Sequence, residues 1–408
     1  MLRRMNSRPN RPIKPWLPYM LGFLTAVGPV STDLYLPGFA MIEAEFHLPH
    51  GAAQITLATW FLGFAVGQMM QGAATDWLGR RLPLLAGTAL YMAASIGCAL
   101  APSMLALAGF RFLAAIGGAA SSVIPRAVVR DHADGHAAAK IMSQLVLVMG
   151  VAPILAPTAG GFFLQFVSWR ALFWLCAGYG LAGFALVYFF LPETLPRADR
   201  HPVDVLAAAK RYARILCEPN FASHAFMSSA GIFTIFAFVA GSPTLIVAYH
   251  ISPLQLGALL MVTATPYILC AQINPRLLRQ FGIDGVIRFA VIGAAVAGLT
   301  LFTATSLWHL PLPLFIAFIM LNTASIGLIM PNATISALSH HATSAGTASA
   351  LIGTLNFLSA ALCGYLGGIV ANGTIRPIAE MLIAGTIPLV LAQFVRVRVR
   401  AKAMVISN

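Results

Sequence analysis

Charged residues are scarce in this chain. Asp, Glu, Lys and Arg make up 9% of its 408 residues and hydrophobic residues 59%, whereas an ordinary soluble domain is about 25% charged. So few charges cannot cover a surface of this size in water, which excludes a soluble globular protein. Apolar runs of about 20 residues, the length that crosses a hydrocarbon core of about 30 Å, recur along the whole chain. The chain is therefore predicted to be an integral membrane protein with nearly all of its mass in the bilayer.

Several chemical motifs are missing as well. None of the five cysteines stands in a C-x-x-C or Cys/His spacing, which argues against a disulfide framework and a metal site. The sequence has no G-x-x-x-x-G-K-[ST] phosphate loop, so we expect no cofactor and no direct drive by ATP. No small-x-small cleavage site follows the first apolar run, so the basic N-terminal segment is predicted to stay attached to a first membrane helix.

Negative charge is the rarer sign, with 12 Asp and Glu against 25 Lys and Arg and a net charge of +13. Such a charge can indicate nucleic-acid binding, but its distribution favours the positive-inside bias of membrane proteins. With a cytoplasmic N-terminus and twelve spans, every Lys and Arg except Arg111, Arg170 and Arg376 falls on the cytoplasmic side. We therefore expect no nucleic-acid partner, and a multi-pass protein of the cell inner (cytoplasmic) membrane with both termini cytoplasmic.

The apolar runs fall into two sets of six. The predicted fold is all-α, with twelve transmembrane helices in two pseudo-symmetric six-helix bundles, at 1–191 and 221–408, and a polar, basic cytoplasmic linker at 192–220. Secondary transporters that rock two halves about a midplane site have this organisation, although a channel or a membrane enzyme also fits it. The predicted spans are 16–39, 52–75, 82–101, 104–129, 138–165, 169–191, 221–249, 255–275, 285–305, 311–335, 345–371 and 377–395.

The loop after the second span reads GAATDWLGRRLPLL. It resembles the G-x-x-x-D-x-x-G-R-[KR] signature of the major facilitator superfamily. A glycine permits a tight turn there, and the arginines can reach carboxylates at neighbouring helix ends. An ordinary solvated loop with inside-positive charge is the alternative. The matching residues are Gly72, Asp76, Gly79, Arg80 and Arg81.

The resemblance implies that this loop is a cytoplasmic latch, or conformational gate, for the outward-facing state. In such a latch Asp76 faces the start of the eleventh span near Ser344, and Arg80 faces Asp131. The matching segment of the second half, NPRLLRQFG, keeps a glycine at Gly282 but has no aspartate at the matching position. The latch is therefore predicted on one side only.

Arg111 lies inside the apolar fourth span, in RFLAAIGGAASS. An arginine in hydrocarbon costs at least about 2.5 to 3.5 kcal/mol, while the small residues after it allow close helix packing. The segment resembles the superfamily's helix 4 signature, whose arginine is tied to proton coupling, although Ala114 stands where the family often has glutamine. A structural pair with a carbonyl or a lipid headgroup is the alternative for Arg111.

Asp33, in GPVSTDLYLPGF, is the only acid well inside a predicted span. It lies five residues beyond the middle of the first span, or roughly 7 to 8 Å at 1.5 Å per residue. Arg111 has the same calculated height on an oppositely running helix. Because intramembrane charges face a cavity or one another, we predict that Asp33 is the protonation site and that Arg111 tunes its affinity for protons.

The fifth span contains GVAPILAPTAGG. Proline bends a membrane helix, and glycine lets a neighbour approach closely. The segment resembles the signature that marks the antiporter branch of the superfamily, with Ala156 in place of the usual glycine before the second proline. A plain packing kink is the alternative. The residues concerned are Gly150, Pro153, Pro157, Gly160 and Gly161.

Four further segments, DLYLPGF, RAVVRD, GLIMPNATISAL and AGTASALIGTLNFL, look like the bicyclomycin and chloramphenicol resistance (Bcr/CflA) subfamily of drug:proton antiporters. This resemblance, over about residues 16 to 395, implies a proton-coupled exporter of small, largely apolar compounds that works by alternating access. We expect a monomer whose partners are a small-molecule substrate, protons and membrane lipid. An exporter of a native metabolite, with incidental drug resistance, is the alternative; an enzyme is disfavoured because only Asp33 and Arg111 are deeply placed. The predicted substrate-binding residues are Asp33, Tyr35, Gln144, Phe233, Phe236, Asn322 and Asn356.

Overall fold

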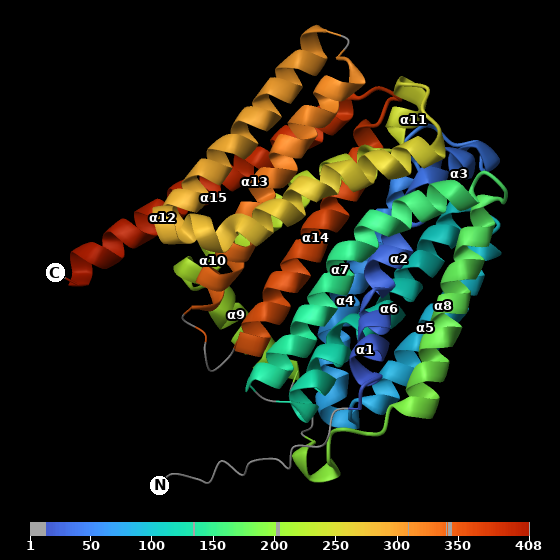
Figure 1. The fold of residues 1–408 in the computed structure, drawn as a ribbon, viewed down its shortest axis with the longest axis vertical. Helices are drawn as coiled ribbons and strands as arrows, with labels where there is room; N and C mark the ends of the chain where they lie inside the picture. The colour runs from blue at the N-terminus through green and yellow to red at the C-terminus, as the bar shows by residue number, and fades with distance from the viewer. Residues whose placement is uncertain are drawn as a thin grey trace.

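The computed structural model describes residues 14–133, 135–200, 205–308, 310–339, 341 and 345–407. These residues are helical apart from short connections, and no strand occurs among them. The helices form two bundles that lie side by side (Figure 1). The predicted all-α fold of twelve spans in two six-helix bundles is confirmed, while the boundaries at residues 191 and 221 stay a prediction.

The first span is broken, whereas a continuous helix over 16–39 was predicted. Pro29 and Pro37 have no backbone N–H to donate, and each proline ring interferes with the preceding helical turn. The span therefore consists of α1, α2 and the 3-10 turn η1, and the short helix α3 follows it in the connection to the second span. The bounds in the first bundle are α1 Leu17–Thr25, α2 Val27–Asp33, η1 Leu36–Gly38, α3 Phe39–Glu45, α4 Gln54–Leu78, α5 Arg81–Ala99, α6 Met104–His132, α7 Gly135–Phe163 and α8 Trp169–Phe190.

The second bundle differs from the prediction in two places. Its second and third spans join in one helical segment, α12, with a single non-helical residue at Gly282, and its last helix continues to Ser407 because no glycine or proline follows Pro388. The linker contains η2 Arg197–Asp199 and the short helix α9 Val205–Leu216. The bounds in the second bundle are α10 Pro219–Gly241, α11 Thr244–Ala248, α12 Pro253–Leu307, α13 Leu312–Leu338, α14 Ala345–Val370 and α15 Arg376–Ser407.

Length and composition agree with the membrane assignment. Within the described ranges, 9 helices are long and apolar enough to cross a bilayer. One of these, α12, carries two predicted spans on either side of Gly282. The broken first span and α4 complete the set of twelve.

Small residues on α6 bring helix backbones together inside the first bundle, as its sequence predicts. A Cβ added to Gly117 of α6 would lie 2.5 Å from the carbonyl oxygen of Gly87 in α5. A Cβ added to Gly67 of α4 would lie 2.9 Å from Cα of Ile116. Both distances are far below van der Waals contact, so larger residues at these positions would force α4 and α5 away from α6.

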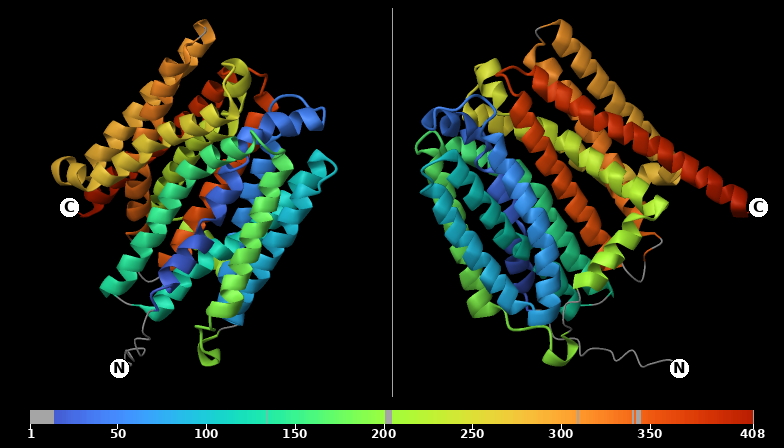
Figure 2. Two further views of the ribbon diagram at one scale, coloured as in Figure 1. Left: turned by 45° about the vertical axis from the view of Figure 1, so that its right-hand side comes forward. Right: turned by 180° about the vertical axis from the view of Figure 1, so that it is seen from behind.

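The bundles pack most closely toward one end. We call the end that carries Arg80 and Arg396 the basic end, and the end that carries Gly51 and Ala371 the far end. The main contacts between bundles join α4 to α14 and α7 to α12. A Cβ added to Gly51 would overlap Ala371, and one added to Gly161 would overlap the carbonyl of Pro253. Figures 1 and 2 show the second bundle tilted against the first, so that the bundles converge at the far end and their basic ends point apart.

Candidate functional site

Arg111 lies inside the first bundle, enclosed by aromatic rings. It is 2% exposed, and its guanidinium carbon lies 4.4 Å from the ring centres of both Tyr35 and Trp60 and 5.8 Å from that of Phe173. Its Nε and Nη2 atoms have no hydrogen-bond partner in the described part of the chain. A desolvated cation over aromatic faces gains about 2 kcal/mol or more. Aromatic faces, rather than a lipid headgroup, therefore surround this charge.

Asp33 is the last residue of α2 and is half-buried. Its carboxylate accepts a hydrogen bond from the Thr32 hydroxyl at 2.9 Å. Among the described residues no ion pair joins it to Arg111 within 4.0 Å. Tyr35, two residues further on, has its ring over Arg111 and shares a hydrogen bond of 2.8 Å with Thr56. Asp33 and Arg111 are therefore near each other but not in direct contact.

The glycine-rich end of α7 packs against the first span beside Asp33. A Cβ at Gly160 would overlap the carbonyl oxygen of Leu34, and the adjacent Gly161 faces the start of α12 in the other bundle. The close approach predicted for these two glycines is therefore present, with Pro153 and Pro157 inside the same helix. It is absent at Gly150, where an added Cβ meets nothing within 4 Å, and the place of Gly150 in a helix kink stays a prediction.

Two predicted substrate residues are amides in the second bundle. The side-chain oxygen of Asn356 in α14 accepts hydrogen bonds from Ser228 and Ser229 of α10, both at 3.1 Å. Asn322 in α13 is 1% exposed, and both of its amide atoms lack a hydrogen-bond partner in the described part of the chain. A buried, unpaired amide costs about 1 to 3 kcal/mol. Asn322 is therefore a stronger candidate than Asn356 for hydrogen bonding to a substrate.

The other predicted substrate residues are dispersed, which corrects the prediction of one shared site. Tyr35 belongs to the Arg111 enclosure inside the first bundle. Phe233 is 8% exposed and packs on α15, where a Cβ at Gly385 would lie 2.7 Å from its ring. Gln144 lies half-buried on α7.

An aromatic cluster crosses the seam between the bundles. Phe61 of α4 lies 4.4 Å from Phe236 of α10 and 6.1 Å from Phe357 of α14, measured between ring centres. Phe64, one turn further along α4, lies 4.6 Å from Phe357. Phe236 is therefore the predicted substrate residue that the structure places at the interface of the two bundles.

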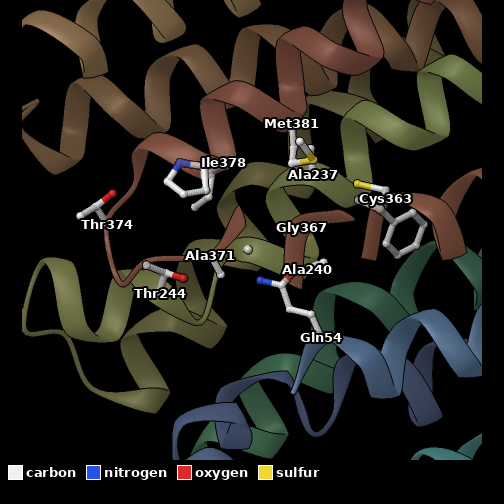
Figure 3. Close-up of a pocket in the computed structure, with 13 residues that line it drawn as sticks. Gln54, Ala237, Ala240, Thr244, Cys363, Gly367, Ala371, Thr374, Ile378 and Met381 are labelled. Carbon is white, nitrogen blue, oxygen red and sulfur yellow. The ribbon is translucent and has the colours of Figure 1, made fainter. Parts of the chain in front are cut away.

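A hollow lies at the far end beside this cluster (Figure 3). Its walls come from α4, α10, α11, α14 and α15, and Gln54 projects into it from the first bundle. The buried Oε1 of Gln54 has no hydrogen-bond partner within the described ranges. The lining residues are Gln54, Phe236, Ala237, Ala240, Gly241, Thr244, Cys363, Gly367, Ala371, Thr374, Pro377, Ile378 and Met381.

The loop between α4 and α5 is built as the signature predicts, with Arg80 at its centre. Arg80 donates from Nε to Asp131 at 3.1 Å and from Nη1 to Asp76 at 2.9 Å, and Gly79 has a φ of +92°, which favours glycine. The partner predicted for Asp76, Ser344, lies outside the described residues. Gly72 has nothing within 4 Å of an added Cβ, so packing does not require a glycine there.

Glu193, just beyond α8, is part of this loop's contacts, although no motif in the sequence points to it. Its carboxylate accepts backbone hydrogen bonds from Arg80 at 2.8 Å and Arg81 at 3.3 Å. Arg81 itself donates to the carbonyl of Tyr188 at 2.7 Å. Glu193 is more than a hundred positions away from Arg80 and Arg81 in the sequence, so these contacts arise only from the fold.

The matching turn of the second bundle also has an ion pair, which corrects the prediction of a latch on one side only. Gly282 has a φ of +66°, and Asp284, two residues later, pairs with Arg396 of α15. Arg396 is 2% exposed and also donates to Gln393 at 3.0 Å. The charges are reversed relative to the first bundle, with the carboxylate at the turn and the arginine on the last helix.

We expect Arg80→Ala to lower the thermal stability of the detergent-solubilised protein markedly. The substitution removes the arginine that pairs with the Asp131 side chain, which is 7% exposed, and breaking a buried pair of this kind costs about 3 kcal/mol. Arg81→Ala is the matched control, because a more exposed cation contributes about 0 to 1 kcal/mol. Equal melting temperatures for the two variants would contradict the central place of Arg80.

Two six-helix bundles that meet at one end, with a carboxylate and an arginine inside the spans, define the class of two-bundle membrane transporters. Residues 21–364 match the model of the Major Facilitator Superfamily. The chain therefore belongs to this superfamily.

Relatives with similar sequences carry transporter or resistance names. The MFS-type transporter YdgK of Bacillus subtilis (strain 168) is 31% identical over 86% of this chain and 88% of its own. A bicyclomycin resistance protein homolog of Haemophilus influenzae is 29% identical over 92% of this chain and 94% of its own. The multidrug resistance protein MdtL of Escherichia coli is 31% identical over 55% of this chain and 56% of its own.

Solved structures share the fold. A peptide transporter in complex with alafosfalin superposes with a TM-score of 0.74 at 13% identity, covering 96% of each chain. A bacterial homolog of the human lysosomal transporter Spinster, in an inward-facing and occupied conformation, gives a TM-score of 0.71 at 15% identity over 95% of this chain and 96% of the other. At such identities the likeness concerns the fold alone.

Proposed function

We propose that this protein is a proton-coupled multidrug efflux transporter that exports small, largely apolar compounds by alternating access. The observation that carries the proposal is full-length similarity to a relative named for bicyclomycin resistance, supported by similarity over about half the chain to a multidrug resistance protein. A half-buried carboxylate in a broken first span, Asp33, supplies a group that can take up and release a proton.

The basic end faces the cytoplasm in this proposal, because it carries most of the Lys and Arg. Both termini are then cytoplasmic, the protein lies in the inner membrane as a monomer, and the linker at 192–220 separates bundles 1–191 and 221–408. With the far end closed, the seam between the bundles opens to the cytoplasm, from which a substrate enters.

Each proposed group has a defined task. Asp33 in its deprotonated form binds a substrate from the cytoplasm and releases it when a proton arrives from the far side, while Arg111 lowers the cost of the negative charge. Asn356, with its oxygen held by two serines, offers its NH2 group to the substrate, and Asn322 offers a full amide. Phe236 supplies an aromatic face. The loop centred on Arg80 stabilises one of the two end states.

The proposal is tested by transport in proteoliposomes with an imposed pH gradient. A proton crossing 100 mV supplies about 2.3 kcal/mol, which sustains a drug gradient of about fifty-fold at 1.4 kcal/mol per decade. We expect a lipophilic antibiotic to move against its gradient when the far side is acidic, and to stop when an ionophore collapses the gradient. Accumulation that persists with the ionophore, or transport of a polar metabolite but of no drug, would overturn the proposal.

A further inference from the structure

A carboxylate and an imidazole meet at the far-end seam between the bundles. Glu43, in α3, and His50, before α4, lie in the connection between the first and second spans. Nδ1 of His50 lies 3.6 Å from Oε2 of Glu43. The Glu43 side chain is 8% exposed, whereas the His50 side chain is 55% exposed. Neither residue belongs to the groups to which the proposed transport cycle assigns a task.

The second bundle covers this pair. Glu43 and His50 line a hollow whose opposite wall consists of residues from α10, α11 and the turn before α15, namely Ala240, Pro243, Thr244, Val247 and Gly373. The backbone of Gly373 packs on the imidazole, since a Cβ added there would lie 3.4 Å from Cδ2 of His50. A separation of the bundles at the far end carries this wall away from Glu43.

The remaining oxygen of Glu43 is held by the start of α4. Oε1 accepts backbone hydrogen bonds from Gly51 at 2.8 Å and from Ala53 at 3.1 Å. Of the residues that line the hollow, Glu43 and His50 are the titratable ones, and no Lys, Arg or Asp is among them. Glu45 is turned away toward Arg170 at 2.6 Å, and Arg376 pairs with Glu380 at 2.9 Å.

Burial raises the pKa of the Glu43 carboxyl, while the two backbone N–H groups and His50 act in the opposite direction. With one proton the pair is neutral overall, either as a carboxylic acid beside a neutral imidazole or as a carboxylate beside an imidazolium. Without that proton, a carboxylate beside a neutral imidazole is buried under an apolar wall, which is costly. Because the imidazole and the carboxylate lie 3.6 Å apart, the proton belongs to the pair rather than to either residue.

We propose that Glu43 and His50 form a second proton-binding site, and that its proton stabilises the closed far end. The sign follows from linkage: the closed state holds the proton more tightly than the open, hydrated state, so closure is favoured as pH falls and weakened as pH rises through the pKa of the pair. The closed-to-open ratio changes tenfold for each pKa unit by which the two states differ. In the proposed antiport cycle, protons from the far side would then promote the return to the state open at the basic end.

The test measures conformation rather than transport, so it does not depend on the proposed substrate. Spin labels at Leu105→Cys and Asn372→Cys, both exposed near the far end on opposite bundles, report the distance across the seam. The native cysteines are replaced, the full chain is placed in lipid nanodiscs, and pH is varied from 5.5 to 8.5. We expect the long-distance, open population to increase with pH in the parent protein.

The variants separate a proton site from a helix cap. Glu43→Gln keeps an oxygen for the N–H groups of Gly51 and Ala53 but cannot ionise, so we expect the far end to stay closed at every pH. His50→Gln removes one of the two groups that can hold the shared proton, so the pair binds that proton less tightly and the transition moves to lower pH. Glu45→Gln, two residues away and outside the seam, is the matched control and keeps the parent's pH response.

Asp33→Asn separates this inference from the proposed function, since the variant loses the proposed transport proton but retains the seam's pH response. A parent protein without a pH-dependent distance would overturn the proposal. So would a Glu43→Gln variant that responds to pH as the parent does.

Discussion

Asp33→Asn will abolish proton-driven accumulation of drug while leaving the protein folded. The amide has almost the same shape as the carboxylate and still accepts a hydrogen bond from the Thr32 hydroxyl, which lies 2.9 Å away, but it cannot ionise. Drug uptake into inverted proteoliposomes under an imposed potential of 100 mV should fall from about fifty-fold accumulation toward equilibration. The dependence of the initial rate on pH should disappear with it.

Binding and stability provide the controls for this variant. Its melting temperature should stay close to that of the parent, because Asp33 forms no ion pair among the described residues within 4.0 Å. Downhill exchange of drug should slow without stopping, since Asp33 is one of several proposed substrate residues while alternating access itself requires no proton at this position. If Asp33→Asn accumulates drug against its gradient as the parent does, Asp33 is not the coupling proton site. The family assignment is not affected by that result.

Gly160→Ala should disrupt the protein more than any other change of a single methyl group discussed here. The added Cβ overlaps the carbonyl oxygen of Leu34, and because that atom is backbone, α7 or the first span must move. Overpacking of this kind costs about 1 to 3 kcal/mol and occasionally more. Since Leu34 follows Asp33 directly, we expect a lower melting temperature and a fall in efflux of at least about tenfold, equivalent to 1.4 kcal/mol.

Gly150→Ala is the matched control on the same helix. An added Cβ there meets nothing within 4 Å, and alanine is about 0.8 to 1.0 kcal/mol more favourable than glycine in a helix interior. The variant should melt at the same or a higher temperature and transport normally. Equal melting temperatures and equal efflux for the two glycine variants would contradict the prediction that transport requires the close contact between α7 and the first span.

The features that the sequence predicts well are those that depend on neighbouring residues. Hydrophobic runs and charge placement were sufficient for twelve spans in two bundles. The glycine at position 79 predicted the turn, and the contact of Arg80 with Asp131 was implied by the resemblance to the superfamily signature. The glycines at 160 and 161 were also recognised, because small residues followed two prolines. In each case the physical cause lies within about ten residues or in a family pattern.

The features that the sequence did not predict depend on partners far along the chain. Nothing in the sequence near Arg111 indicates that aromatic rings from three other spans enclose it. The equal calculated heights of Asp33 and Arg111 in the membrane do not show whether the two side chains touch. Glu193 and the pair of Asp284 with Arg396 likewise require helices that are distant in sequence. The break in the first span is different, because its cause is local: Pro29 and Pro37 lie within the span itself.

The aromatic cluster across the seam gives this protein a dependence on temperature. Closing the far end removes the rings of Phe61, Phe236 and Phe357 from water, and burial of apolar surface near room temperature is favoured mainly by entropy, with a negative change in heat capacity. That driving force weakens on cooling. The closed conformation consequently loses part of its advantage in the cold, and the balance between the two ends of the transport cycle changes with growth temperature even when pH and substrate are constant.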